Sequence, residues 1–228
     1  MRSPIVIACS FAVAGLSQAA VVFSDDFSET PGTLIVGKPA DTGSAWSGSA
    51  GSPPLAVSAA NTADTSGDAR TIFGDFTGTL ASGQAVTVSF DTLSLGNFFS
   101  GGYAGVSLYA GIDERIFIGD AGGPGSNSFW AIDGNAVGLN LSSDATTATS
   151  AEFTYLFDTG AWTLTTTSGV NLSGTGVANI AFDRIRIANG AGGDIQVDNL
   201  VVDISAVPEP TTLALVGLGS LCAFRRRR

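Results

Sequence analysis

The chain has 228 residues, enough for one sandwich-sized domain or two small ones. It carries 20 acidic against 10 basic residues and no histidine, and its net charge is −10. Half of the basic residues are terminal, namely Arg2, Arg225, Arg226, Arg227 and Arg228, so the body is more acidic still. Nucleic acid is excluded as a partner, because phosphate binding needs a basic surface. The lack of histidine excludes Ser-His-Asp catalysis and imidazole zinc sites.

Residues 1–19 have the layout of a secretory signal peptide. Met1 and Arg2 give a positive start, an apolar run follows, and Ser17-Gln18-Ala19 places small residues before a cut after Ala19. A buried first strand or helix is the alternative, but it does not account for a charged start followed by a small-residue site. We therefore predict export through this segment.

The body, residues 20–206, alternates apolar and polar residues in short runs. Val86, Val88 and Phe90 alternate with polar neighbours, and Trp162 and Leu164 alternate with threonines. A period of two with β-branched and aromatic residues predicts half-buried strands. The predicted strands are 21–27, 70–73, 86–91, 103–110, 114–119, 128–132, 153–158, 162–165, 180–188 and 195–204. Strands of this length, separated by Gly- and Asp-rich turns, predict an all-β sandwich or barrel.

The same alternation predicts local details. Residues 157–162 predict a hairpin turn. In the last strand Ile195 and Leu200 belong to opposite parities, so we predict a bulge near Asp198-Asn199. Residues 41–67 are rich in Ser, Ala and Gly and predict a long loop or an edge excursion. The side chains predicted to face inward are Phe90, Phe153, Phe157, Ile185, Leu200 and Val202.

The C-terminal segment has three parts in a fixed order. Val207-Pro208-Glu209-Pro210 precedes an apolar run at 211–224, and four consecutive arginines end the chain. As a helix this run is about 21 Å long, short of a hydrocarbon core of about 30 Å. It spans a thin or deformed bilayer if the flanking residues snorkel. The arginines resist translocation, so Arg225, Arg226, Arg227 and Arg228 are predicted to fix the orientation, with the body across the membrane.

Residues 207–228 resemble the PEP-CTERM sorting signal of Gram-negative bacteria, in which a Pro-Glu-Pro motif precedes a short helix and a basic end. The resemblance implies recognition of Pro208, Glu209 and Pro210 by an exosortase, a transpeptidase-like enzyme of the inner membrane. The helix is then removed, and the protein reaches the cell surface or extracellular matrix. Such tails are also catalogued as an ice-binding protein C-terminal domain. A plain membrane anchor is the alternative, but anchoring does not need Pro-x-Pro before so short a helix.

A second resemblance concerns the body. Residues 101–108, 114–119, 160–164 and 197–200 resemble the LamG-like or concanavalin A-like jelly roll of bacterial surface proteins. The resemblance implies a single jelly-roll β-sandwich over residues 20–206. Lectins, glycan-binding modules, adhesins and glycosidases share such folds, so it implies a fold and no one activity.

The carboxylates of the body do not form a known catalytic pattern. Jelly-roll glucanases carry Glu-x-Asp-x-x-Glu on one strand, and Glu29, Glu114 and Glu152 do not have that spacing. Asp113 and Glu114 are adjacent, so on a strand they point to opposite faces. An aspartate pair brought together by folding stays open. We expect a non-catalytic protein.

Calcium is the one cofactor for which the sequence offers ligands. Asp25 and Asp26 lie near the first strand, and Asp194 and Asp198 lie near the last. If these strands pair, their oxygens converge on a site suited to a hard cation. The alternative is a set of solvated carboxylates that keep the surface soluble.

Aromatic side chains offer platforms for sugars. Trp46, in a Ser- and Gly-rich context, and Trp130 are the candidates for exposure, whereas Trp162 belongs to the core pattern. The alternative for both is a core position. The sequence therefore predicts a secreted surface or matrix protein with a structural or polysaccharide-associated role. The alternatives are a divergent glycoside-active enzyme and an ice-binding protein, the latter requiring a regular Thr-x-Thr array of which residues 163–167 give one run.

Overall fold

The computed structural model describes residues 19–49, 55–65, 70–95, 102–122, 130–190 and 192–207. Within these ranges every regular element is a β-strand, which confirms the all-β prediction. No helix in this described part of the chain is long and apolar enough to cross a membrane.

The predictions made for the two ends of the chain concern residues that lie almost entirely outside these ranges. The signal peptide at 1–19 lies outside the described residues except for its last position. The same holds for the sorting motif Pro208-Glu209-Pro210 and the apolar run at 211–224. The orienting arginines also lie outside them, namely Arg225, Arg226, Arg227 and Arg228. The roles assigned to these residues therefore stay predictions.

The first sheet contains both ends of the body. Its strands run in the order β1-β14-β5-β10-β11-β12, all antiparallel, and β3 also pairs with β14. Their bounds are Ala20–Asp25 (β1), Ala63–Asp64 (β3), Gln84–Leu95 (β5), Thr149–Leu156 (β10), Ala161–Thr166 (β11), Asn171–Thr175 (β12) and Ile195–Ala206 (β14). The first and last strands of the body are therefore neighbours.

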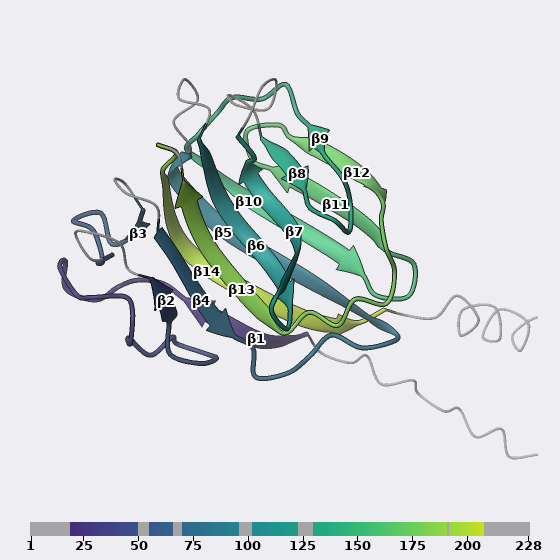
Figure 1. Cartoon of the computed structure of the whole chain (residues 1–228), viewed down its shortest axis with the longest axis horizontal. Coiled ribbons are helices and arrows are strands. Elements are labelled where there is room, and N and C mark those ends of the chain that lie inside the picture. Colours follow the sequence, from purple (N-terminus) through teal and green to yellow (C-terminus); the bar gives the residue numbers. More distant parts are fainter. Residues whose placement is uncertain are drawn as a thin grey trace, which may run out of the picture.

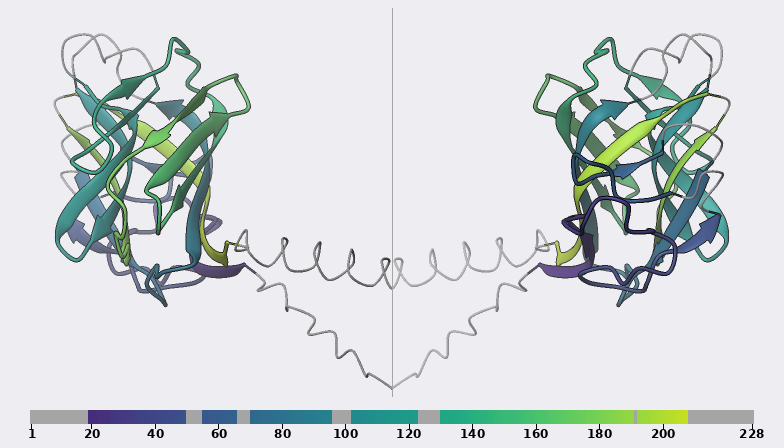
Figure 2. Two further views of the ribbon diagram at one scale, coloured as in Figure 1. Left: turned by 90° about the vertical axis from the view of Figure 1, so that its right-hand side faces the viewer. Right: turned by 90° about the vertical axis from the view of Figure 1, so that its left-hand side faces the viewer.

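The second sheet lies over the first (Figure 1). Its order is β2-β4-β13-β6-β7-β8-β9, again antiparallel. The bounds are Ser47–Ser49 (β2), Arg70–Asp75 (β4), Tyr103–Ala110 (β6), Asp113–Asp120 (β7), Ala131–Asp133 (β8), Asn140–Leu141 (β9) and Arg184–Gly190 (β13). The chain passes repeatedly between the sheets, and the side views in Figure 2 show the two layers of one sandwich.

The core lies between the sheets, as the alternation predicts. Of the residues predicted to face inward, five are buried at 2% exposure or less: Phe90, Phe153, Ile185, Leu200 and Val202. Phe157 is half-buried, because it follows the last residue of β10 and packs against the edge of the core. Full burial of such side chains stabilises the fold by about 1.5–3 kcal/mol each.

Two local predictions are confirmed. The hairpin joins β10 to β11, and Gly160 at its end has φ 66°, a conformation that favours glycine. The bulge lies in β14, where the pairing with β5 shifts between Asp198 and Val201, and Asn199 has φ 49°. This extra residue restores the parity that brings Leu200 into the core.

The strand predicted at 180–188 differs from the observed one, whereas the long loop or edge excursion predicted at 41–67 is confirmed in its described part. The strand predicted at 180–188 begins at Arg184, because Phe182 bonds the loop backbone at Leu80 and Ile180 instead of a neighbouring strand. The stretch 41–67 is mainly loop and contributes only the short strands β2 and β3 in its described part. Apolar residues in these regions cover the open edges of the core without joining a ladder.

The parity of β11 gives a direct test of the sandwich. Leu164 is fully buried and the adjacent Thr163 is exposed. We expect Leu164→Ala to lower the free energy of unfolding by about 2–5 kcal/mol, since it leaves a cavity between the sheets. Thr163→Ala should change it by less than about 0.5 kcal/mol. Urea unfolding monitored by fluorescence measures both, and equal effects would contradict the assigned faces.

Candidate functional site: a groove on the second sheet

The outer face of the second sheet carries two arginines. In β13 the buried Ile185 and Ile187 alternate with Arg184 and Arg186, which therefore point away from the core. The body contains few other basic side chains, namely Lys38, Arg70 and Arg115. Two of the few basic side chains of the body therefore lie next to each other on the outer face of this sheet.

Arg186 lies at the centre of a polar cluster. Its Nη2 donates hydrogen bonds to Oε1 of Glu114 and, at 3.0 Å, to Oγ of Ser107. The Ser107 hydroxyl donates to the same Glu114 oxygen at 2.6 Å. The guanidinium carbon lies 5.3 Å from the ring centroid of Tyr109. Its Nε is buried without a hydrogen-bond partner among the described residues, so this donor is left unsatisfied.

Arg184, two residues earlier in β13, likewise lies beside a carboxylate and over an aromatic ring. It pairs with Asp75, and its guanidinium carbon lies 5.5 Å from the ring centroid of Phe73. The Phe73 ring meets Tyr109 edge-on, with the centroids 5.3 Å apart. Burial raises the pKa of Tyr109 above its usual value, so its phenol stays protonated at neutral pH. Each cation is therefore placed over an aromatic ring and beside a carboxylate.

Glycines let two more rings lie against the sheet. A Cβ atom on Gly105 would come within 2.6 Å of Cζ of Phe117, and one on Gly190 within 2.7 Å of Cζ of Tyr103. Any larger residue would push these rings away from the backbone. The rings of Tyr103 and Phe117 meet edge-on at a centroid distance of 6.3 Å.

A cavity of about 340 Å³ opens beside these rings, and we call it the outer groove. Its size falls at the lower end of the range for small-ligand sites. The lining combines two aromatic side chains with groups that donate and accept hydrogen bonds. It consists of Tyr103, Glu114, Phe117, Ala121, Asp133, Gly134, Asn135 and Arg186.

The tryptophans predicted as platforms are not exposed, and that prediction is wrong. Trp46 is 1% exposed, packs against Phe23 at a centroid distance of 5.0 Å, and donates from Nε1 to Oδ2 of Asp25 at 2.6 Å. Trp130 is fully buried and donates from Nε1 to the carbonyl of Thr146 at 2.8 Å. Both satisfy their one polar group inside the protein, so their polar sequence context reflects loops that fold over the core.

The calcium ligands do not converge as predicted. The carboxylate of Asp25 is fully buried and accepts hydrogen bonds from Lys38, Trp46 and the Phe27 backbone, so it has no open position for an ion. Asp25 lies opposite Leu200, whereas Asp194 precedes β14 and is about 15 Å or more away along the strand. The condition that β1 and β14 pair is met, and Asp198 lies close enough to Asp25 and Asp26 for their charges to raise its pKa, but Asp194 is remote from them.

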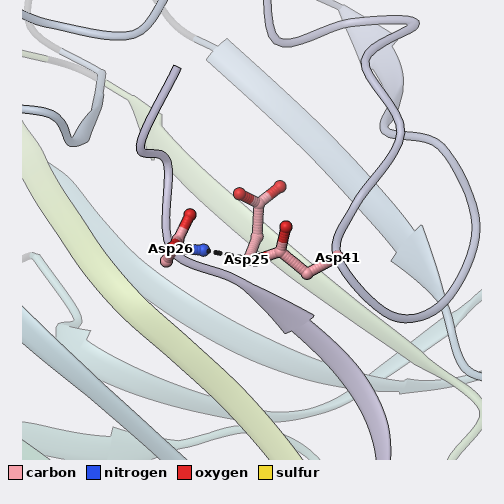
Figure 3. Close-up of side chains that lie close together, drawn as sticks. All are labelled: Asp25, Asp26 and Asp41. Carbon is pink, nitrogen blue, oxygen red and sulfur yellow. Dashed lines mark hydrogen bonds between the residues drawn. The ribbon is translucent and has the colours of Figure 1, made fainter.

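Three carboxylates do gather at the end of β1 (Figure 3). Oxygens of Asp25, Asp26 and Asp41 lie within 4.8 Å of one another, and the backbone N–H of Asp26 donates to Asp41 at 3.0 Å. Asp26 and Asp41 are exposed. Asp25 is committed to Lys38, so only Asp26 and Asp41 correspond to the solvated carboxylates of the alternative interpretation.

The threonine array required for ice binding is irregular. On the outer face of the first sheet, Thr87, Thr154 and Thr163 stand side by side in register. In the next row Glu152 and Asn171 interrupt the hydroxyls. A hollow of about 290 Å³ also indents this face beside Glu152. The described residues therefore lack the flat, regular array that this alternative requires.

The residues of the outer groove were not identified from the sequence. One local signal was present, because Arg184 and Arg186 at i and i+2 on a strand must share a face. Nothing local places Glu114, Asp133 or Asn135 beside them. These residues come together only through the register of β13, β6, β7 and β8.

Comparisons with known proteins agree with the tail and with the fold. Residues 206–228 match the family model of the PEP-CTERM protein-sorting motif, which confirms the predicted sorting segment. This motif implies export and exosortase processing at the membrane. A search of curated protein sequences found no match.

Among solved structures, the chain is similar to the CBM2 module of the evolved Dit of Lactobacillus casei BL23 phage J-1. The identity is 14% and the TM-score 0.55, over 86% of this chain and all of the module. A sialidase matches at 10% identity and TM-score 0.50, over 84% of this chain but only 19% of the enzyme. A lectin from Bauhinia forficata in complex with GalNAc matches at 9% identity and TM-score 0.49, over 84% of this chain and all of the lectin. At these identities the likeness is one of fold.

The raised pKa of Asp198, in β14, predicts how the stability of the protein depends on pH. Burial raises this pKa, and the charges of Asp91 and Asp26 raise it further. The carboxylate therefore costs stability above the folded-state pKa, and this cost disappears as the pH falls toward the unfolded value of 3.8. We expect Asp198→Asn to stabilise the protein at pH 7 by about 0.2–1 kcal/mol, a value discounted for partial exposure. Below pH 3.8 we expect no gain in stability.

A matched variant should show the opposite sign. The hydroxyl of Ser168 donates to Asp144 and lowers the pKa of Asp144. Asp144 therefore adds stability above pH 3.8, and this stability is lost as the pH falls through the lowered folded-state pKa. Asp144→Asn should destabilise the protein at pH 7. Melting temperatures across pH 2–7 measure both, and a stabilising Asp144→Asn would contradict the assignment.

Proposed function

We propose that this chain is an exported, non-catalytic glycan-binding sandwich, delivered to the cell surface or extracellular matrix by its C-terminal segment. The observation that carries the proposal is the outer groove, where the rings of Tyr103 and Phe117 lie beside polar groups. These groups belong to Glu114, Asp133, Asn135 and Arg186. The likeness of the fold to a carbohydrate-binding module supports it.

The lining suits a saccharide. A sugar ring offers an apolar C–H patch together with hydroxyls that both donate and accept hydrogen bonds. The aromatic side chains of Tyr103 and Phe117 offer apolar surface to this patch. Carboxylates accept, the guanidinium donates, and the exposed amide of Asn135 does both. Because Glu114 is already neutralised by Arg186, the groove favours an uncharged sugar over a polyanion.

Delivery follows from the two ends of the chain. The signal peptide at 1–19 starts export, and the apolar run at 211–224 holds the precursor in the inner membrane of a Gram-negative cell. An exosortase then recognises Pro208-Glu209-Pro210, whose prolines keep the backbone extended and accessible, and cleaves the tail away. The cationic end stays on the cytoplasmic side, through Arg225, Arg226, Arg227 and Arg228.

A glycoside-active enzyme is the second candidate. Glu114 and Asp133 line the same groove, and a pair of carboxylates is what glycosidases use. Against this role, Oε1 of Glu114 already accepts hydrogen bonds from Arg186 and Ser107. Release of reducing ends from matrix polysaccharide by the purified protein would favour the enzyme over the binding module.

Binding is tested with a glycan array and a matched pair of variants. Asn135 lines the groove, and Asn171 is likewise an exposed asparagine but lies on the far sheet. We expect Asn135→Ala to weaken binding of the best glycan by about threefold to tenfold, the worth of one or two hydrogen bonds. Asn171→Ala should leave the affinity unchanged. Equal affinities for both variants, or no bound glycan, would contradict the groove.

Sorting is tested by replacing Glu209. We expect Glu209→Gln to leave membrane insertion intact and to trap the uncut precursor in the inner membrane, since the apolar run is unchanged. Glu152→Gln, in the body, should be processed normally. Cell fractionation with mass spectrometry of the C-terminus measures both. Surface-located protein that still ends in Arg228 would overturn processing and leave a plain anchor.

A further inference from the structure

A lysine and an aspartate are buried together beneath the loop that follows β1. The side chains of Lys38 and Asp25 are 3% and 0% exposed. The Nζ atom of Lys38 lies 2.8 and 2.7 Å from the two carboxylate oxygens of Asp25. It also lies 2.6 Å from Oε1 of Glu29, whose side chain is 33% exposed. A primary amine therefore contacts two carboxyl groups in a site that contains little water.

Aromatic rings wall this site. Nζ of Lys38 lies 5.6 Å from the ring centroid of Phe27, and Trp46 packs against Phe27 at a centroid distance of 6.0 Å. Burying a charged pair in such surroundings is costly, because both ions lose their hydration. The cost falls if the pair becomes neutral, either by proton transfer or by condensation to an amide.

We propose that Lys38 and Asp25 form an intramolecular isopeptide bond. The amine nitrogen of Lys38 attacks Cγ of Asp25, and the new N–C bond replaces the bond from Cγ to the carboxylic hydroxyl. The products are one amide and one water molecule. The reaction exchanges no electrons with an outside group and needs no co-reactant.

Each oxygen of Asp25 has one fixed donor, so whichever oxygen leaves as water, the oxyanion that forms on the other keeps a hydrogen bond. Nε1 of Trp46 donates to Oδ2 of Asp25 at 2.6 Å, and the backbone N–H of Phe27 donates to Oδ1 at 2.9 Å. Fixed donors of this kind stabilise the negative charge that develops on a carbonyl oxygen, and they act strongly where water is excluded. This arrangement selects Asp25, and not Glu29, as the electrophile.

Glu29 is suited to move the protons. Its Oε1 contacts Nζ, and its Oε2 is buried without a hydrogen-bond partner among the described residues. It can accept a proton from the attacking nitrogen and pass it to the departing hydroxyl, so the carboxylate is regenerated. The carboxyl that is not consumed thus acts as the general base and then as the general acid.

The ionisation of the pair is compatible with this step. Burial raises the pKa of Asp25, which favours the carboxylic acid required at Cγ. Burial lowers the pKa of Lys38, but its hydrogen bonds to Asp25 and Glu29 outweigh that effect and leave the pKa raised. The amine therefore becomes nucleophilic when its proton passes to Asp25, which converts the ion pair into a neutral acid and a neutral amine.

The decisive measurement is the intact mass of the purified mature chain, compared with the mass calculated from its own mapped termini. We expect the protein to be lighter by one water molecule. Cleavage after Phe27, inside the ring from Asp25 to Lys38, should leave the two fragments joined. An unchanged mass would overturn the proposal and leave a buried ion pair.

Variants assign the bond and the proton carrier. Lys38→Arg keeps the positive charge but removes the nucleophile, and Glu29→Gln removes the base, so both should have the full, uncondensed mass. Glu152→Gln, in β10 three strands away from β1 in the same sheet, should remain condensed. Circular dichroism verifies that each variant is folded, and the wild-type mass decides the question even if one is not. Succinimide formation at Asp133-Gly134 would give the same loss of mass. If peptide mapping places the water loss there, the isopeptide proposal is overturned.

Discussion

Each sheet of this protein can hide its apolar side only against the other sheet, and this single constraint determines where every strand residue goes. Inner positions such as Ile185 and Leu200 are apolar and buried. Charged and aromatic residues of the same strands, such as Arg186 and Tyr109, are then placed on the outer face in register with one another. The groove is thus a consequence of the core, because shifting one strand by a residue would dismantle both.

Two charged clusters illustrate how differently the fold treats ionic groups. Arg186 and Glu114 meet on an outer face, where their side chains are 12% and 33% exposed. Lys38 and Asp25 meet beneath a loop, where desolvation is costly and each oxygen of the acid has a donor. The first arrangement leaves groups available to a ligand, whereas the second turns them toward each other.

Local pattern was enough for much of the fold. The range Tyr103–Ala110, the hairpin before Trp162 and the bulge after Asp198 all follow from parity and turn chemistry, and the C-terminal motif was readable as a string. The groove was not predictable, because Arg186 and Glu114 are 72 residues apart and meet only through strand register. Trp46 misled for a related reason, since its polar neighbours do not reveal that the indole caps Asp25.

The position of β14 has a mechanical consequence. This strand lies between β1 and β5 and leads directly to the sorting segment, so a body held through that end takes load at Ala206. Antiparallel hydrogen bonds run perpendicular to the strands, and a pull along β14 therefore strains its bonds to both neighbours together. A load applied at Ala206 is thus shared by the strands on both sides of β14.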